Sequence, residues 1–407
     1  MAAAPTSEET TLLSYLSHFS NVLVKDVSLQ KGKGLFAKKD FREGELIFEE
    51  KPLICGQFLW NSLYKYTACS HCLRSLETAE QMARRLSGND SLELPYASKC
   101  CEITRMGLKI ISCHNCQVKY CSEECRQRAW DHYHRTLCLG QNEGDPSHPL
   151  EQLQESWRKM HYPPETASVM LIAQMIATVL QAPDPKKMQD VFESFCHSVV
   201  NRGQQIVHKL LGDQFKEQLD ILRVQMSNAL YDEKLEEWFK MEGFLSLMAL
   251  VGINGQGIGT SSLSVYVHNL ENLGDITEDE RQALDIFIDQ LYEEMYNVSG
   301  QFLNCEGSGL YALQSSCNPS CEPNAEVTFP HNNSTLVLKA LHDIKEGEEI
   351  VICYLNCCDR ERSRHSRQRL LRENYLFNCT CPKCESQSGD PDVTSSEDDD
   401  DSMEEDS

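Results

Sequence analysis

The 407-residue sequence predicts an α+β fold in which one strand-bearing unit is split by two insertions. Short runs rich in β-branched and aromatic residues occur towards both ends of the chain, at 21–50 and at 309–355. Between them lie a cysteine-rich segment at 69–138 and a mostly helical stretch at 150–300. We therefore expect one strand-rich fold, interrupted by a cysteine-rich module and a helical insert.

The individual elements follow from local patterns. NVLVKDV and GELIFEE read as strands that flank the turn-rich QKGKGLFA. Pro163 and Pro164 suit the start of a helix. Apolar residues spaced three and four apart predict helices at 151–160, 164–182, 213–230 and 279–296. Strand signals return at 309–314, 324–329, 335–341 and 348–355, and a basic helix is predicted at 359–375.

The charge of the chain is strongly negative and unevenly distributed. Its formal net charge is −24, and residues 390–407 hold ten Asp or Glu with no Lys or Arg. This balance argues against direct nucleic-acid binding and suits a basic partner. We interpret the acidic tail as a disordered, solubilising segment; the alternative is that it attracts basic substrates such as histone tails or ribosomal proteins.

The sequence predicts neither export nor a membrane anchor. The first ten residues, MAAAPTSEET, contain two acids and no apolar core of a signal peptide. The most apolar stretch, 167–182, is too short and too polar for a membrane span and reads as a buried helix. Twenty cysteines in such a chain indicate a reducing compartment and metal binding rather than disulfides. The expected location is the cytoplasm and the nucleus.

Four pairs of metal-binding residues fall within 69–138. Pairs at such spacings let one turn supply two corners of a tetrahedron, and eight soft ligands suit two zinc ions. We expect one ion to be bound by Cys69, Cys72, Cys121 and Cys125, and the other by Cys113, Cys116, His134 and Cys138. The long insert between the first and second pair contains Cys100 and Cys101, which remain rival ligands, as does His132.

A second set of cysteines lies near the carboxy terminus and consists of Cys379, Cys381 and Cys384. Three thiolates leave one corner of a zinc tetrahedron open. The best candidate for that corner is Cys321 in the loop CNPSCEPN, on the expectation that this loop and the carboxy-terminal segment line one site. The alternative is a local site completed by Cys357 or Cys358.

The segment from Arg360 to Arg372 contains six arginines. Such a segment can meet RNA or an acidic partner. We interpret it instead as a solvated helix face whose charges pair with Glu361 and Glu373.

Five motifs occur along the chain in the order KGKGLFA, the eight-ligand cysteine module, CNPSCEPN, GEEIVICYL and ENYLFNCTCPKC. This order resembles the SET-and-MYND (SMYD) family of protein lysine methyltransferases over nearly all of residues 20–385. The enlarged zinc module, and an acidic tail in place of a helical repeat domain, are similar to one branch of that family. The resemblance implies a SET-type β fold split by a MYND zinc module and a helical insert, with a post-SET zinc site and an acidic disordered tail. The corresponding parts are an N-terminal segment at 1–20, the SET N-terminal part at 21–68, the MYND-type module at 69–138, the helical insert at 139–300, the SET C-terminal core at 301–357, the post-SET segment at 358–386 and the tail at 387–407.

The resemblance assigns the binding of S-adenosylmethionine to residues far apart in the sequence. Gly32, Lys33 and Gly34 are similar to the turn that receives the cofactor, where glycine lets the backbone approach closely. Asn254 is similar to the family asparagine at the cofactor's amino-acid end, and Asn318 to the cofactor-binding asparagine of the loop after the insert.

Three aromatic residues match family positions around the reaction. Tyr354 matches the catalytic tyrosine and would also touch the cofactor. Tyr375 would face the lysine channel as a second catalytic residue, and Phe377 would pack on the cofactor. Aromatic faces favour the cationic sulfonium and the methylated ammonium product.

Pro319 departs from the family pattern, in which a histidine usually follows the asparagine. The family uses the backbone amide and carbonyl at this position to read the adenine. Proline has no N–H, so one cofactor hydrogen bond is lost, at roughly 0.5–1.5 kcal/mol. It also favours an extended conformation for Asn318. We expect weakened cofactor affinity rather than loss of activity.

The leading hypothesis is an S-adenosylmethionine-dependent protein-lysine N-methyltransferase that acts on basic protein substrates such as histones or ribosomal proteins. Three zinc ions would be structural, since Cys and His fill every ligand position. The alternative is an adaptor whose zinc module binds proline-containing peptides, with a weak or inactive SET fold; Pro319 favours it, and the three aromatic residues argue against it. We expect a monomer without membrane or direct nucleic-acid contact.

Overall fold

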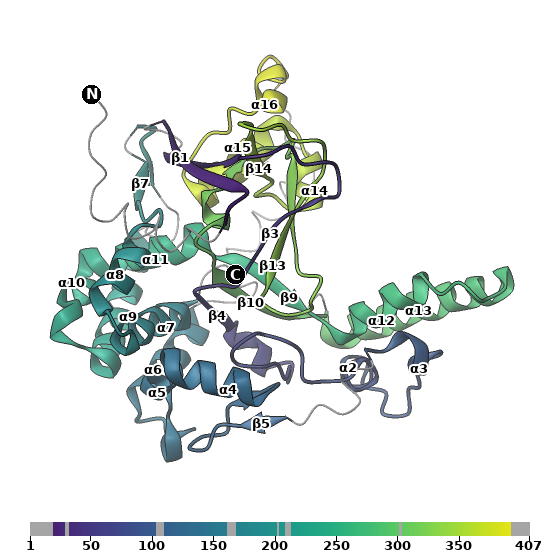
Figure 1. The fold of residues 1–407 in the computed structure, drawn as a ribbon. Coiled ribbons are helices and arrows are strands. Elements are labelled where there is room, and N and C mark those ends of the chain that lie inside the picture. Colours follow the sequence, from purple (N-terminus) through teal and green to yellow (C-terminus); the bar gives the residue numbers. More distant parts are fainter. Residues whose placement is uncertain are drawn as a thin grey trace.

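The computed structural model describes residues 19–28, 32–102, 110–160, 168–201, 203–207, 213–300 and 303–391 (Figure 1). The expectations for most of the N-terminal segment, for a helix start at Pro163 and Pro164, and for the acidic tail from 392 onward fall outside these residues.

Segments from both halves of the chain share one sheet, as a split fold requires. Strand β1 (Val22–Ser28) pairs with β2 (Gly32–Ala37), β2 pairs with β14 (Glu349–Ile352), and β14 pairs with β11 (Asn318–Pro319). Strand β14 runs antiparallel to β2 and parallel to β11, with Asn318 opposite Val351. The sheet therefore places the amino-terminal glycines next to the loop at 318 and the strand that leads to Tyr354.

Two further three-stranded sheets are present in the described part of the chain. One contains β4 (Ile54–Gln57), β10 (Cys305–Leu310) and β9 (Gln256–Thr260). The other contains β12 (Ala325–Thr328), β13 (Leu336–Ala340) and β3 (Leu46–Glu50). Buried side chains such as Ile54, Leu310 and Leu338 join these sheets in one hydrophobic core.

The helical insert packs on this core through a nearly all-apolar helix. Helix α7 (Val169–Gln181) is buried along most of its length and contacts β4, which fits a helix that is hydrophobic on every side. It contacts α6 (Pro149–Met160), α8 (Pro185–Glu193), α9 (Asp213–Leu230) and α11 (Met241–Asn254). Helix α10 (Glu236–Phe239) packs against α9 and α11. A short hairpin of β7 (Val200–Asn201) and β8 (Ile206–Val207), absent from the predicted elements, lies between α8 and α9. None of the described helices combines the length and apolarity that crossing a bilayer requires.

The long insert between Cys72 and Cys113 belongs to a separate helical lobe. Its helices α2 (Ala79–Ser87) and α3 (Ala97–Cys100) pack against α12 (Ser262–Glu271), and α2 also packs against α13 (Glu278–Ser299). In Figure 1 these four helices project from one side of the molecule. A core that includes Met82, Leu86 and Leu291 holds them together, which explains why the insert is long without extending the metal module.

Three predicted elements differ from the structure. The strand predicted at 309–314 lies earlier, as β10 (Cys305–Leu310), and a short 3-10 helix occupies Gln314–Ser316. Residues 32–34 begin strand β2 rather than forming a separate turn, because they pair with β1 in the antiparallel register. Gly32 takes a positive φ of 66° next to the register shift of this pair. The basic segment 359–375 is two helices, α14 (Cys357–Glu361) and α15 (Arg364–Tyr375). Ser363 separates them, since its hydroxyl caps α15 by accepting a hydrogen bond from Ser366 N.

The interpretation of the six arginines as a solvated face is wrong for Arg367. Its side chain is only 1% exposed, whereas Arg360 forms a partly exposed ion pair with Glu361 as predicted.

Candidate active site and metal centres

A cavity of about 1400 Å³ lies where the β2–β14–β11 sheet meets the helical insert and the segment after α15. Its walls bring together parts of the chain that are distant in sequence. The predicted site residues that line it are Gly32, Lys33, Asn254, Asn318, Pro319, Tyr354, Tyr375 and Phe377. Gly34 is buried behind this wall.

Gly34 leaves the space that the Asn318 side chain occupies. A Cβ added at Gly34 would lie 2.5 Å from Val27 Cγ2, 2.8 Å from Glu349 Oε1 and 3.1 Å from Asn318 Nδ2. The first two distances are shorter than real Cβ contacts, so any larger residue would displace these groups. Gly32, in contrast, opens directly onto the cavity with nothing within 4 Å of its added Cβ.

Asn318 connects three strands through its side-chain amide. Its Nδ2 donates to Lys33 O at 3.1 Å and to Glu349 Oε1 at 2.7 Å. The next residue, Pro319, lies opposite Ile352 in the β11–β14 pair, and Ser320 N donates to Ile352 O at 2.8 Å. The loop that contains Asn318 is therefore fixed against both β2 and β14.

Three aromatic rings form one wall of the cavity. The Tyr354 hydroxyl donates to Cys317 O at 2.9 Å, and the Tyr354 and Tyr375 ring centres are 4.8 Å apart. Phe377 meets Tyr354 edge-on at 6.3 Å. Burial raises the pKa of Tyr354 far above that of an ordinary phenol, and burial also raises the pKa of Tyr375. Both hydroxyls therefore remain protonated near neutral pH, and neither is suited to act as an anionic base.

Asn254 uses its side-chain amide for two contacts within the protein. Its Nδ2 donates to Cys196 O at 2.7 Å and to Leu250 O at 2.9 Å. In this structure the residue joins the carboxyl end of α11 to the loop that follows α8, both of which line the cavity.

Gln314, which lines the cavity, and Glu50, which is outside the lining but accepts a hydrogen bond from the backbone of Gln314, were missing from the sequence-based set. Gln314 lines the cavity, and its Nε2 donates to Gln256 Oε1 at 3.1 Å, while its buried Oε1 has no partner in the described part of the chain. Glu50, at the end of β3, accepts from Leu313 N at 2.8 Å and from Gln314 N at 2.9 Å. No local pattern marked either residue, because each contact joins segments remote in sequence.

The β7–β8 hairpin contacts the segment that closes the cavity, residues 376–382. Asn201 Nδ2 donates to Leu376 O at 2.8 Å, and Asn378 N donates to Gln204 Oε1 at 3.0 Å. These two bonds hold the closing segment to the helical insert.

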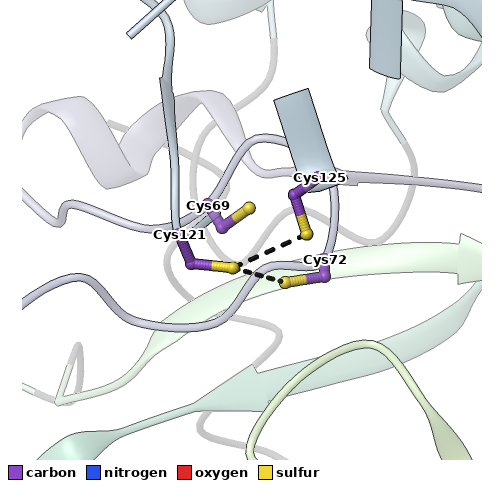
Figure 2. Close-up of side chains that lie close together, drawn as sticks. All are labelled: Cys69, Cys72, Cys121 and Cys125. Atoms are coloured by element: carbon purple, nitrogen blue, oxygen red, sulfur yellow. Dashed lines mark hydrogen bonds between the residues drawn. The ribbon is translucent and has the colours of Figure 1, made fainter. Parts of the chain in front are cut away.

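The cysteine module contains two groups of four possible metal ligands, each with its ligand atoms within 4.8 Å of one another. The first, shown in Figure 2, consists of Cys69, Cys72, Cys121 and Cys125. The second consists of Cys113, Cys116, His134 and Cys138. The structure therefore groups the residues in the expected interleaved arrangement, the first pair with the third and the second with the fourth. Burial lowers the pKa of His134, which keeps its imidazole neutral and able to bind a metal.

The rival ligands lie outside both groups. Cys100 is buried in the helical lobe, where its carbonyl accepts a hydrogen bond from Asn269, and Cys101 packs against the same core. His132 is exposed, whereas His134 is buried beside Cys116, with 3.3 Å between Cys116 Sγ and His134 Nε2.

A third group joins the loop at 317–324 to the carboxy-terminal segment. It consists of Cys321, Cys379, Cys381 and Cys384, all of them buried. Cys321 Sγ lies 4.0 Å from Cys379 Sγ and 3.6 Å from Cys384 Sγ. Cys358 is exposed and outside the group, and the side chain of Cys357 lies outside the described part of the structure. The geometry thus favours Cys321 as the fourth member.

Known proteins resemble the chain over most of its length. The SET domain family matches residues 32–355. The protein-lysine N-trimethyltransferase SMYD5 of Gallus gallus is 59% identical over 91% of this chain and 87% of its own, and that of Homo sapiens is 56% identical over 93% and 89%. The histone-lysine N-methyltransferase SMYD3 of Mus musculus is 24% identical over 91% of this chain and 63% of its own.

A solved structure of the SET domain of LSMT bound to lysine and AdoHcy is also similar. The similarity extends over 92% of this chain and 58% of the LSMT chain, with 11% sequence identity and a TM-score of 0.30. That score is too low to support a conclusion about this chain.

Proposed function

We infer, from the premise that the chain belongs to the SMYD branch of the SET-domain family of protein-lysine N-methyltransferases, that the cavity binds S-adenosylmethionine and a substrate lysine. The observation that carries this proposal is the meeting of Gly32, Asn318 and the Tyr354 ring around one cavity. The order of the motifs in the sequence alone does not require that meeting.

The cavity has the features that such a cofactor needs. Gly32 leaves open space at one end, where a bound molecule can approach the backbone. The unpartnered Gln314 Oε1 offers a buried acceptor to an ammonium or amino group. Gly32, Lys33, Asn318 and Phe377 would hold the cofactor, with Asn254 fixing the neighbouring loop.

S-adenosylmethionine, when bound, supplies a methyl group already activated by its sulfonium. The chain must then align the lysine amine, admit it as the free base and exclude water. Alignment of two reactants can account for roughly 7–11 kcal/mol of a barrier. Tyr354 and Tyr375 provide a rigid aromatic wall that favours cationic groups, and the Tyr354 hydroxyl is oriented by its bond to Cys317 O.

The three cysteine groups fit structural zinc. Each offers four Cys or His ligands with no open position for a reacting water, which is the donor set of structural sites. We propose one zinc ion per group, with the two amino-terminal groups forming a MYND-type module and the third a post-SET site. The domain boundaries given above are part of the same proposal.

Pro319 belongs to the proposed adenine-binding loop. It lacks the N–H that a histidine there would supply, so we propose a weaker cofactor complex with activity retained. The substrate is proposed to be a basic protein in the cytoplasm or nucleus, such as a histone or a ribosomal protein, because the chain carries a net charge of −24. We further propose that it acts as a monomer and that, as in the names of its SMYD5 relatives, three methyl groups are added.

Transfer of a labelled methyl group from S-adenosylmethionine to mixed histones or cell lysate tests the proposal. Tyr354→Phe keeps the ring but removes the hydroxyl that bonds Cys317 O, and we expect a rate about 10²-fold lower. Absence of transfer by the unaltered protein to any lysate protein would favour the adaptor alternative.

A further inference from the structure

Arg367 is a buried guanidinium without a carboxylate partner in the described part of the chain. It lies on α15 and is 1% exposed. One terminal nitrogen donates to Arg362 O at 2.6 Å, and the other donates to Gln387 Oε1 at 2.7 Å and Cys384 Sγ at 3.6 Å. Its Nε has no hydrogen-bond partner among the residues that the structure describes. Removing a charge from water is costly unless an opposite charge compensates it.

Among these partners only Cys384 can carry a negative charge. The carbonyl of Arg362 and the amide of Gln387 are neutral acceptors. Cys384 is one of four buried cysteines whose sulfur atoms lie within 4.8 Å of one another. Four neutral thiols would leave the guanidinium uncompensated. Four thiolates around one Zn²⁺ carry a net charge of two negatives, which is what a buried cation needs.

The two amino-terminal groups lack this combination. In the group of Cys69, three of the four ligands are partly exposed, so water can solvate its charge. The group of Cys113 includes a neutral imidazole, which leaves one negative charge fewer on a zinc centre. The carboxy-terminal group, with four buried thiolates, has the greatest need of a cation from the protein.

We propose that Arg367 is the counter-ion of a four-thiolate metal centre at Cys321, Cys379, Cys381 and Cys384, and that metal loading thereby fixes helix α15. Two neighbours of Arg367 on the same face of α15 also bond to the backbone of the cysteine group. Arg364 Nε donates to Cys384 O at 2.8 Å, and Gln368 exchanges hydrogen bonds of 2.6 and 2.8 Å with the backbone of Cys379.

The consequence for the cavity follows from the course of the chain. Tyr375 ends α15, Leu376 turns the chain with a φ of 61°, and Phe377 and Cys379 follow in the closing segment. When the metal leaves, Arg367 loses the negatively charged centre that compensates its buried charge. Helix α15 then loosens, and the aromatic wall loosens with it.

Zinc release from the full-length, metal-loaded protein to a coloured chelator tests the proposal. Arg367→Met preserves much of the side-chain length but removes the charge, and we expect one zinc ion to leave 10–100-fold faster, with the others unchanged. Arg367→Lys keeps the charge and should stay within a few-fold of the unaltered protein. Arg364→Met is the matched control, because it removes a hydrogen bond to the same cysteine but not the buried counter-ion.

Thermal unfolding with and without chelator separates this role from simple packing. Metal-loaded Arg367→Met should melt below the unaltered protein, and this difference should vanish or reverse after chelation, since the variant no longer buries an uncompensated charge. Unchanged zinc release, an equal effect of Arg364→Met, or an equal loss of stability with and without metal would each overturn the proposal.

If Arg367→Met does not fold, Arg367→Gln can replace it. Its zinc release and melting are then compared with those of Arg367→Lys, which keeps the charge. None of these readouts requires methyl transfer, so a failure here leaves the proposed function standing. A failure of methyl transfer likewise leaves the zinc result interpretable.

Discussion

Replacing Glu50 by Gln should remove a distinct pH dependence from the stability of this protein. Glu50 is 4% exposed, and burial raises the pKa of its carboxyl from the ordinary 4.5 to about 7, opposed in part by hydrogen bonds from the backbone of Leu313 and Gln314. Because the folded state holds this proton more tightly than the unfolded state, Glu50 stabilises the fold below pH 4.5. That contribution is lost as the pH rises through 7.

The size of the effect follows from the two pKa values. Each unit of difference corresponds to about 1.4 kcal/mol, so the shift from 4.5 to about 7 gives roughly 2–3 kcal/mol between pH 5 and pH 8. The glutamine side chain that replaces the carboxyl does not titrate. The free energy of unfolding of the unaltered protein should therefore fall by that amount relative to Glu50→Gln as the pH rises.

Urea unfolding at several pH values between 5 and 8 measures this difference. The other titrating groups contribute equally to the free energy of unfolding of both proteins, so their contributions cancel when the two are compared. Glu326→Gln, on an exposed position of β12, is the matched control and should leave the pH profile unchanged. If the free energies of unfolding of the unaltered protein and Glu50→Gln differ by a constant amount over this range, the pKa of Glu50 is not raised by burial.

Three other changes test the cavity. Gly34→Ala should destabilise the fold by about 1–3 kcal/mol in urea unfolding and weaken cofactor binding in calorimetry, because its Cβ would overlap Val27 and Glu349. Gly259→Ala, with open space at its Cβ and a position outside the cavity lining, should be neutral in both measurements. Pro319→His should tighten S-adenosylmethionine binding up to about tenfold by restoring one N–H donor, and calorimetry showing no gain would count against that assignment. Asn201→Ala removes the donor to Leu376 O, which should raise the KM for the cofactor while leaving Tm nearly unchanged. A kcat and KM equal to those of the unaltered protein would show that this bond does not help to close the cavity.

Local sequence patterns predicted the elements that depend only on nearby residues. The apolar spacing at 213–230 matches α9 in both bounds, and the strand signals at 324–329 and 335–341 match β12 and β13. The expected grouping of the possible ligands also matches the structure, although paired spacings alone do not decide which two pairs share one ion.

Contacts between remote segments could not be predicted in this way. Glu50 meets Leu313 across 263 residues, and neither position carries a local signal for the other. The partner of the cysteine insert, α13, is also remote from it along the chain. Arg367 was placed on a solvated face because arginines in a charged run are usually exposed, and only the folded position of the cysteine group shows why this one is buried.

Calorimetric titration of the metal-loaded protein with S-adenosylmethionine measures directly whether the cavity is a cofactor site. We expect binding at one site, and at least tenfold weaker binding by Asn318→Ala, which loses the bonds to Lys33 O and Glu349 Oε1 that fix the cavity wall. No heat of binding to the unaltered protein, or equal affinity in Asn318→Ala, would contradict a cofactor site at this cavity.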